Sequence, residues 1–217
     1  MFNLDPMVML LTLPGIILGF AFHEFSHAIV ADRLGDPTPR NQGKLTLDPR
    51  VHIDLFGLIL IILLGFGWAK PVQTSPRYFK HPKRDSNLVA LAGPVINLAI
   101  ALSFGILLKI IIIGGLQLNT SSTLFDTLIK LCFYTIRINI VLFIFNLLPV
   151  PGLDGFHVLK NLIPLRNYNI IYALEKYGTI ILIIIIVTPV ASYVIGGPIA
   201  FVQNTIFQLL DLSRYFL

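Results

Sequence analysis

The stretch from Met7 to Ala31, MVMLLTLPGIILGFAFHEFSHAIVA, is apolar for long enough to cross a lipid bilayer as one helix. Near its end, His23, Glu24 and His27 form the motif H-E-x-x-H. Residues four positions apart share one face of a helix, so both imidazoles point the same way and Glu24 lies about 100° from His23. Neutral imidazoles suit zinc, and a carboxylate beside the ion suits a general base. The stretch therefore predicts a metal site inside a membrane helix.

The surroundings of this motif decide between two interpretations. In a soluble helix, a bare match is most often a pair of surface histidines with an unrelated glutamate. Within a membrane segment, ionisable groups are costly and persist mainly when they are partnered or functional. The position of the motif inside an apolar run therefore favours the metal site.

The composition of the chain indicates an integral membrane protein. Of the 217 residues, 55% are hydrophobic and 12% are charged, which leaves too little polar surface for a soluble globule. The net charge of +5 comes from clusters that interrupt the apolar runs, without an aromatic-basic module, so we expect no nucleic-acid partner. The lipid bilayer is the expected surrounding instead. The chain enters its first apolar run without a basic segment or a small-residue cleavage site, so we expect a retained span.

Four further apolar runs are long enough to cross the hydrocarbon core. They are Asn87–Ile113, Phe125–Leu148, Tyr168–Thr188 and Val190–Leu210. A sixth run, Leu55–Gly67, has only 13 residues, which favours an element that dips into the membrane and returns. We therefore expect an all-α polytopic membrane protein with about five transmembrane helices, or six if the short run crosses.

The distribution of lysine and arginine gives an independent test of this topology. If the short run returns to its starting side, twelve basic residues fall on one side of the membrane and none on the other. They are Arg33, Arg40, Lys44, Arg50, Lys70, Arg77, Lys80, Lys83, Arg84, Lys160, Arg166 and Arg214. If it crosses, the division is eight against four, a weaker asymmetry. The positive-inside rule makes the basic side cytoplasmic, so we expect a multi-pass cell-membrane protein with its zinc site toward the cytoplasmic side.

Two segments around the short run have the pattern of extended backbone. Lys44–Leu47 alternates polar and apolar residues after the turn signal Gly35–Pro39. Gly65–Val72 has the composition of an extended return from the membrane. Together with the short run, these segments predict a membrane-dipping hairpin with strand-like parts.

The two histidines leave a zinc site incomplete, because a catalytic zinc takes three protein ligands and keeps a position for water. The best third ligand is Asp154, which follows the helix break Pro149–Gly152 at the predicted cytoplasmic end of its span. His23 and His27 approach the same end. An Asp-Gly pair by itself more often supports a turn. The motif and the topology together favour a ligand, and hence one zinc ion per chain.

Two helices carry polar residues whose roles stay open at this point. Small residues and one amide recur at every fourth position, in the order Gly93, Asn97, Ala101 and Gly105. Such a stripe indicates close helix packing. The amide of Asn97 either bonds to a neighbouring helix or donates to a developing oxyanion, and the spacing does not choose. Arg137 and Asn139 lie deep in their span, where they either bond to neighbouring groups or line a water path.

Three motifs, in this order along the chain, resemble those of the site-2 protease family of intramembrane zinc metalloproteases. They are His23-Glu24-Phe25-Ser26-His27, Ala92-Gly93-Pro94 with Asn97, and Asn146 through Asp154-Gly155. The resemblance covers roughly Pro14 to Gly155. The chain is similar to the short bacterial members of this family. The resemblance implies that His23, His27 and Asp154 bind zinc, that Glu24 is the catalytic base, and that Asn97 takes part in the active site.

The resemblance also implies cleavage of transmembrane segments of membrane-protein substrates, by attack of a zinc-bound water with the assistance of Glu24. No segment is large enough for the PDZ or CBS domain of other members. We therefore expect a single domain over residues 1–217, with a catalytic core at about 7–160 and C-terminal helices at about 168–213. The hairpin is then the expected substrate-facing element, because an extended edge can bind an unwound peptide. The residues of that edge are Trp68, Ala69, Lys70, Pro71 and Val72.

A second function fits the same ligands: a membrane metal-binding or transport protein, or a catalytically silent relative that retains substrates. Glu24 separates the two interpretations. A carrier needs ligands and exchange, whereas hydrolysis requires a base that is not itself a ligand. The sequence thus favours a zinc metalloendopeptidase, and it carries no signal of the oligomeric state.

Overall fold

The computed structural model of the chain describes residues 5–64, 67–117, 122–164, 168–188 and 190–216. The structure is built from helices, and the residues described form no β-strand. The helices are α1 (Pro6–Arg33), α2 (Thr38–Asn41), α3 (Pro49–His52), α4 (Leu55–Leu64), a 3₁₀-helix (Pro76–Tyr78), α5 (Pro82–Gln117), α6 (Thr123–Asn146), α7 (Asp154–Leu162), α8 (Tyr168–Val187), α9 (Val190–Leu209) and α10 (Ser213–Phe216). The all-α part of the predicted fold class therefore fits the structure.

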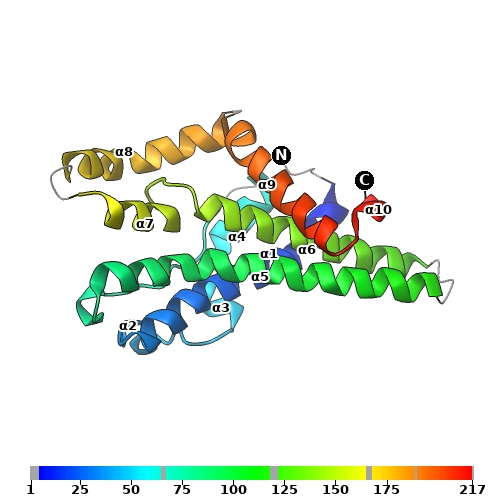
Figure 1. Cartoon of the computed structure of the whole chain (residues 1–217), viewed down its shortest axis with the longest axis horizontal. Helices are drawn as coiled ribbons and strands as arrows, with labels where there is room; N and C mark the ends of the chain where they lie inside the picture. The colour runs from blue at the N-terminus through cyan, green and yellow to red at the C-terminus, as the bar shows by residue number, and fades with distance from the viewer. Residues whose placement is uncertain (1–4, 65–66, 118–121, 165–167, 189, 217) are drawn as a thin grey trace.

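Three long helices, α1, α5 and α6, pack against one another and form the centre of the molecule (Figure 1). Glycines allow α1 to approach α6 closely, since a Cβ on Gly15 would lie 2.9 Å from Thr135 Cα. One on Gly19 would lie 2.8 Å from Leu142 Cδ1. Helix α9 packs on α6, and its Phe207 joins a buried apolar cluster that also contains Cys132.

Local signals explain where the long helices begin and end. Asp5 Oδ1 accepts a hydrogen bond from Met7 N at 2.8 Å, and the proline at position 6 has no N–H to leave unsatisfied. Ser122 Oγ accepts from Phe125 N at the start of α6. Helix α6 ends three residues before Pro149, which cannot continue the helical hydrogen-bond pattern.

By length and apolar composition, three helices of the described chain can cross a membrane, fewer than the five predicted. They are α1, the part of α5 from Pro82 to Leu116, and α6. The last two predicted runs form α8 and α9, helices of 20 residues each that lie outside the central three (Figure 1).

The predicted strand-like hairpin is wrong. Among the described residues, the β-type pairing consists of one isolated antiparallel bridge between Ile53 and Ala69. Lys44–Leu47 is not a strand, because four alternating residues supply no partner and a helix begins directly after them. The side chain of Asp48 caps that helix, α3, by accepting from Arg50 N at 3.0 Å. Of the predicted return segment Gly65–Val72, the first two residues lie outside the described ranges.

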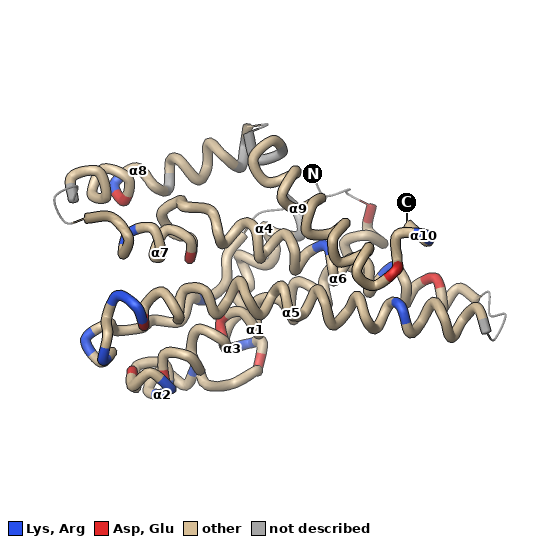
Figure 2. Tube along the Cα trace, viewed as in Figure 1, with Lys and Arg blue, Asp and Glu red and all other residues tan. Residues whose placement is uncertain are grey.

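The connection from α1 to α5 leaves and returns at the same end of these helices. Ser75 N, shortly before α5, donates to Asp36 Oδ2, shortly after α1, at 2.6 Å. Helix α4, in between, has 10 residues, so at 1.5 Å per residue it is about 15 Å long, half the hydrocarbon thickness. Lysine and arginine gather at this end, around α2 and the start of α5 (Figure 2).

Candidate metal centre

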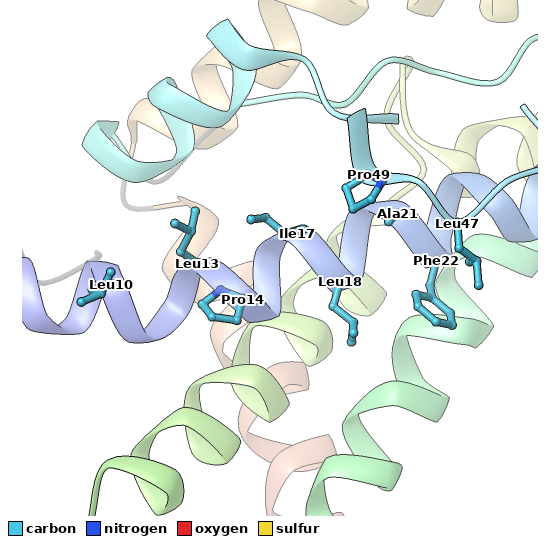
Figure 3. Close-up of a pocket in the computed structure, with 9 residues that line it drawn as sticks. All are labelled: Leu10, Leu13, Pro14, Ile17, Leu18, Ala21, Phe22, Leu47 and Pro49. Carbon is cyan, nitrogen blue, oxygen red and sulfur yellow. The ribbon is translucent and has the colours of Figure 1, made fainter. Parts of the chain in front are cut away.

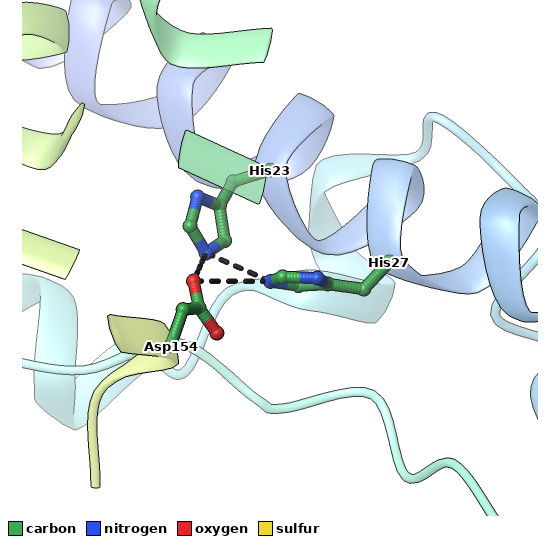
Figure 4. Close-up of side chains that lie close together, drawn as sticks. All are labelled: His23, His27 and Asp154. Carbon is green, nitrogen blue, oxygen red and sulfur yellow. Dashed lines mark hydrogen bonds and ion pairs between the residues drawn. The ribbon is translucent and has the colours of Figure 1, made fainter. Parts of the chain in front are cut away.

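Three side chains that are distant in sequence converge beside α1. His23 and His27 lie on its buried face, and Asp154 reaches them from the first turn of α7 (Figure 4). The two Nε2 atoms are 3.0 Å apart. Asp154 Oδ2 lies 3.1 Å from Nε2 of His23 and 3.4 Å from Nε2 of His27. Among the His, Cys, Asp and Glu side chains of the described residues, these three form a group with the spacing of a metal site.

The three donor atoms have the spacing that zinc requires. Ligand atoms at 2.0–2.1 Å from a tetrahedral zinc lie about 3.3 Å from one another, close to the three separations found here. His27 Nδ1 lies 2.7 Å from the carbonyl oxygen of Val89, which can only accept, so Nδ1 carries the proton and Nε2 has a lone pair. Asp154 Oδ2 is buried and has no hydrogen bond of good geometry. Lone pairs that converge in this way are satisfied by a cation.

Helix α5 passes directly behind the donor atoms at Gly93. A Cβ at this position would lie 2.5 Å from both His23 Cε1 and His27 Nε2. The sequence explained Gly93 as part of a packing stripe, but the structure shows that its missing side chain leaves room for the imidazoles.

Asp154 is held at the centre by the way α7 is attached. Asn161 Nδ2, near the end of α7, donates to Asn87 Oδ1 on α5 at 2.7 Å. A carboxylate at this place supplies the anionic donor that a zinc site takes.

Glu24 is buried but stands apart from the three converging donors. Its Oε2 accepts a hydrogen bond from Val72 N at 2.9 Å. This bond fixes one carboxylate oxygen beside the centre. The arrangement separates an acidic group suited to proton transfer from the three groups suited to metal binding.

The segment expected to face a substrate passes along this glutamate. It consists of Trp68, Ala69, Lys70, Pro71 and Val72. Two of its N–H groups are used within the chain, since Val72 bonds to Glu24 and Lys70 N donates to His52 O at 2.7 Å. Ala69 is the residue of the isolated bridge, and Trp68 is 45% exposed.

Lys44 fastens the same segment, a role that the sequence did not reveal. Its Nζ donates to Val51 O at 2.8 Å and to Lys70 O at 3.3 Å. In the sequence this lysine counted as one of the basic residues beside the membrane and as the first residue of the predicted strand-like segment Lys44–Leu47. No local motif distinguishes a lysine that bonds to carbonyl groups from one that is solvated.

Asn97 lies on the side of His23 that faces away from Asp154. Its Oδ1 is 2.7 Å from His23 Nδ1, and its Nδ2 donates to Gly19 O at 3.2 Å and to Asn139 Oδ1 at 3.0 Å. Both amide hydrogens are engaged by neighbouring helices. This geometry favours the interhelical hydrogen bond over the oxyanion donor, the two alternatives that the sequence left open.

An apolar groove of about 540 Å³ runs along α1 toward the centre. Figure 3 shows it between α1 and the segment that runs from Leu47 to Pro49, the first residue of α3. A second hollow, of about 360 Å³, shares Ile17 and Pro49 with the first and extends to Lys70. Ile17 is two helical turns before Glu24, so both hollows lie along the face of α1 that carries this glutamate.

The sequence profile of Peptidase family M50 matches residues 109–189, a range that contains Asp154 but not the two histidines. No solved structure gives a significant match.

Curated relatives match over most of the chain. The putative zinc metalloprotease YwhC of Bacillus subtilis is 40% identical, over 89% of this chain and 88% of YwhC. The putative zinc metalloprotease Rip2 of Mycobacterium tuberculosis is 26% identical, over 95% of this chain and 75% of Rip2. The putative zinc metalloprotease MJ0611 of Methanocaldococcus jannaschii is 29% identical, over 73% of each protein.

Proposed function

The chain belongs to peptidase family M50, the site-2 protease family of zinc metalloproteases, and from this premise we propose that it hydrolyses peptide bonds within or near transmembrane segments of membrane-protein substrates. One observation carries the proposal. His23, His27 and Asp154 converge with the spacing of zinc ligands, while Glu24 stands beside them without joining them. A metal carrier needs the first three groups but has no use for the fourth.

In this proposal His23, His27 and Asp154 hold one zinc ion per chain. When bound, zinc supplies a Lewis acid that polarises a carbonyl oxygen and lowers the pKa of water. The protein contributes two neutral imidazoles and one carboxylate, a ligand set that leaves one positive charge uncompensated. The apolar helices around the centre exclude water, so the interaction of that charge with nearby groups is screened less than in solvent.

Glu24 is the general base of the proposed reaction. It accepts a proton from the attacking water and returns it to the amine that leaves. The bond from Val72 N to Oε2 orients the carboxylate, so that its other oxygen is the one that receives the proton.

The substrate is proposed to approach along the two hollows beside α1. Their lining is mostly apolar from Leu10 to Phe22, which suits a membrane segment, and the second hollow reaches Lys70. Trp68–Val72 then contacts the substrate near Glu24. This assignment is supported by the position of the segment, which ends in direct contact with the proposed base.

The protein is proposed to lie in the cell membrane with the zinc site toward the cytoplasm. The histidines occupy the later turns of α1, and Asp154 follows the C-terminal end of α6. This is the end of the helices where lysine and arginine gather (Figure 2), and the positive-inside rule places such an end in the cytoplasm.

The test compares wild type with Glu24→Gln, both purified, loaded with zinc and reconstituted in liposomes with membrane proteins extracted from the host. Mass spectrometry identifies fragments cut within apolar segments, and atomic absorption measures bound zinc. We expect such fragments from wild type only, a rate at least 10²-fold lower for the variant, and equal zinc content in both. Equal cleavage by the variant contradicts the assigned base. Zinc flux across the liposome without any cleavage supports the carrier.

A further inference from the structure

A chain of buried polar side chains leads away from the metal centre into the middle of the three helices. It runs from His23 on α1 to Asn97 on α5 and then to Asn139 on α6. The two links are 2.7 Å and 3.0 Å long, and both asparagines are fully buried. The sequence left the role of Asn139 open between a hydrogen bond to neighbouring groups and the lining of a water path.

The direction of this chain is set at its far end by backbone carbonyl groups. Asn139 Nδ2 donates to Thr135 O at 2.9 Å and to Gly15 O at 3.4 Å. A carbonyl oxygen can only accept, so the NH₂ group of Asn139 has to face these two oxygens. Its Oδ1 therefore faces Asn97.

The same reasoning fixes the orientation of the Asn97 amide and, through it, the tautomer of His23. The NH₂ group of Asn97 meets two acceptors, Asn139 Oδ1 and the carbonyl oxygen of Gly19. Its Oδ1 must then face His23, where it can only accept. Nδ1 of His23 therefore carries the proton, and Nε2 presents a lone pair toward Asp154.

We propose that Asn97 and Asn139 act as a positioning relay that holds His23 in the Nδ1–H tautomer, with Nε2 free to bind the metal ion. Neither residue touches the substrate. The proposal deepens the proposed function and rests on it only in taking zinc as the ion that the centre binds. It also assigns a role in metal affinity to Asn139, which acts on His23 through Asn97.

The comparison with His27 explains why two asparagines are needed. His27 Nδ1 bonds to the carbonyl oxygen of Val89, which has a fixed direction. His23 instead bonds to a side-chain amide, which can rotate and present either its oxygen or its nitrogen. A second amide, itself fixed by two carbonyl oxygens, removes that freedom.

The glycines of α1 give the relay its space. A Cβ on Gly19 would lie 2.9 Å from Asn139 Oδ1, and one on Gly15 would lie 3.1 Å from Thr135 Oγ1. Without these side chains, two carbonyl oxygens of α1 come within reach of the asparagines. Gly15 and Gly19 thus serve the orientation of His23 as well as helix packing.

The test uses Asn139→Leu, which keeps the number of side-chain heavy atoms and their branching and removes both hydrogen-bonding groups. Thr135→Val is the matched control, since it removes one buried polar atom from the same helix, one turn away, and leaves the backbone carbonyl in place. Both proteins are labelled with ¹⁵N-histidine in detergent micelles. The imidazole nitrogen shifts report the tautomer of the metal-free protein, and His23→Gln assigns the signals of His23.

We expect a single Nδ1–H tautomer at His23 in wild type and in Thr135→Val, and a mixture in Asn139→Leu. Zinc affinity, measured by competition with a chromophoric chelator, should fall about 10-fold in Asn139→Leu, the size expected for loss of an outer-shell partner. A wild-type tautomer together with wild-type affinity in Asn139→Leu overturns the relay. Equal losses in Thr135→Val also overturn it, because they show a general effect of disturbing the core.

Asn139→Asp keeps the proposal testable if the leucine variant does not fold. An aspartate keeps an oxygen toward Asn97, so the tautomer of His23 should stay as in wild type, and a mixed tautomer contradicts the relay. None of these measurements requires cleavage. If wild type shows the expected tautomer but cleaves nothing, the proposed function is refuted and the relay stands. If wild type is an active protease and the variants keep its tautomer and zinc affinity, the relay alone is refuted.

Discussion

Gly93→Ala is the substitution that separates a metal centre from an ordinary polar contact between helices. The added Cβ would lie 2.5 Å from His23 Cε1 and His27 Nε2, and ordinary contact begins near 3.4 Å. The imidazoles would therefore have to move by about 0.9 Å. Metal–ligand distances tolerate only about 0.2 Å. We expect zinc affinity to fall roughly 100-fold or more, beyond the effect of losing an outer-shell partner.

The helix itself should survive this change. Alanine is better than glycine in the interior of a helix by about 1 kcal/mol, so α5 has no intrinsic reason to unfold. Overpacking at the centre costs about 1–3 kcal/mol, which offsets this gain and leaves a folded protein of similar or slightly lower stability. Loss of zinc without loss of helical content is the specific signature of the arrangement.

Gly105→Ala is the matched control, because it places the same methyl group on the same helix. Its Cβ would lie 2.6 Å from Leu210 Cδ1, the end of a flexible side chain that can rotate away. Both variants are purified in detergent, titrated with zinc against a chelator and compared by circular dichroism during heating. Wild-type zinc affinity in Gly93→Ala, with the protein folded, would show that the two imidazoles do not bind a metal at the observed positions.

Three further predictions use the same preparations. Asp154→Asn should lower zinc content because it removes the anionic ligand, whereas Asp211→Asn, a change at an exposed residue, should not; equal zinc in both variants removes Asp154 from the site. Ala69→Pro should slow cleavage without changing zinc affinity, because proline cannot donate a backbone hydrogen bond to a substrate, and an unchanged rate argues against contact at this residue. Cysteines introduced singly at Lys44 and Lys80, with the native cysteine removed, should both be protected from an impermeant reagent in intact cells; labelling of one alone means that the chain crosses between them.

Most of the sequence signals for His23, His27 and Asp154, the three side chains that converge in the structure, are local. A helical spacing of four residues brings His23 and His27 together wherever the helix lies. Asp154 follows a break that prolines impose, so its place at a helix start depends on neighbouring residues alone. Glu24 is adjacent to a ligand, and its separation from the donors follows from the geometry of one turn.

Two features show where prediction from the sequence failed: the hydrogen bond between Asn97 and Asn139, which was missed, and the strand-like hairpin, which was predicted and is absent from the described residues. Asn97 and Asn139 are 42 residues apart, and their bond depends on which faces of α5 and α6 meet, which no local pattern records. The alternation at Lys44–Leu47 predicts a strand, but a strand forms only when it pairs with a partner, and these residues have none. The capping signal of Asp48 before a proline, which predicts a helix start, was present in the same segment and was the better guide.

The loop that delivers Asp154 shows how each residue of a short motif meets a separate physical requirement. Gly152 has φ +95°, a conformation in which a side chain would be strained, and it turns the chain back after the prolines. A Cβ on Gly155 would lie 2.7 Å from the carbonyl oxygen of Leu148, so only glycine lets α7 begin this close to the end of α6. Asp154 then occupies the first turn of α7, where the positive end of the helix dipole favours a carboxylate. The turn, the close approach and the helix dipole therefore all act on Asp154, and they hold its carboxylate in a fixed position beside His23 and His27.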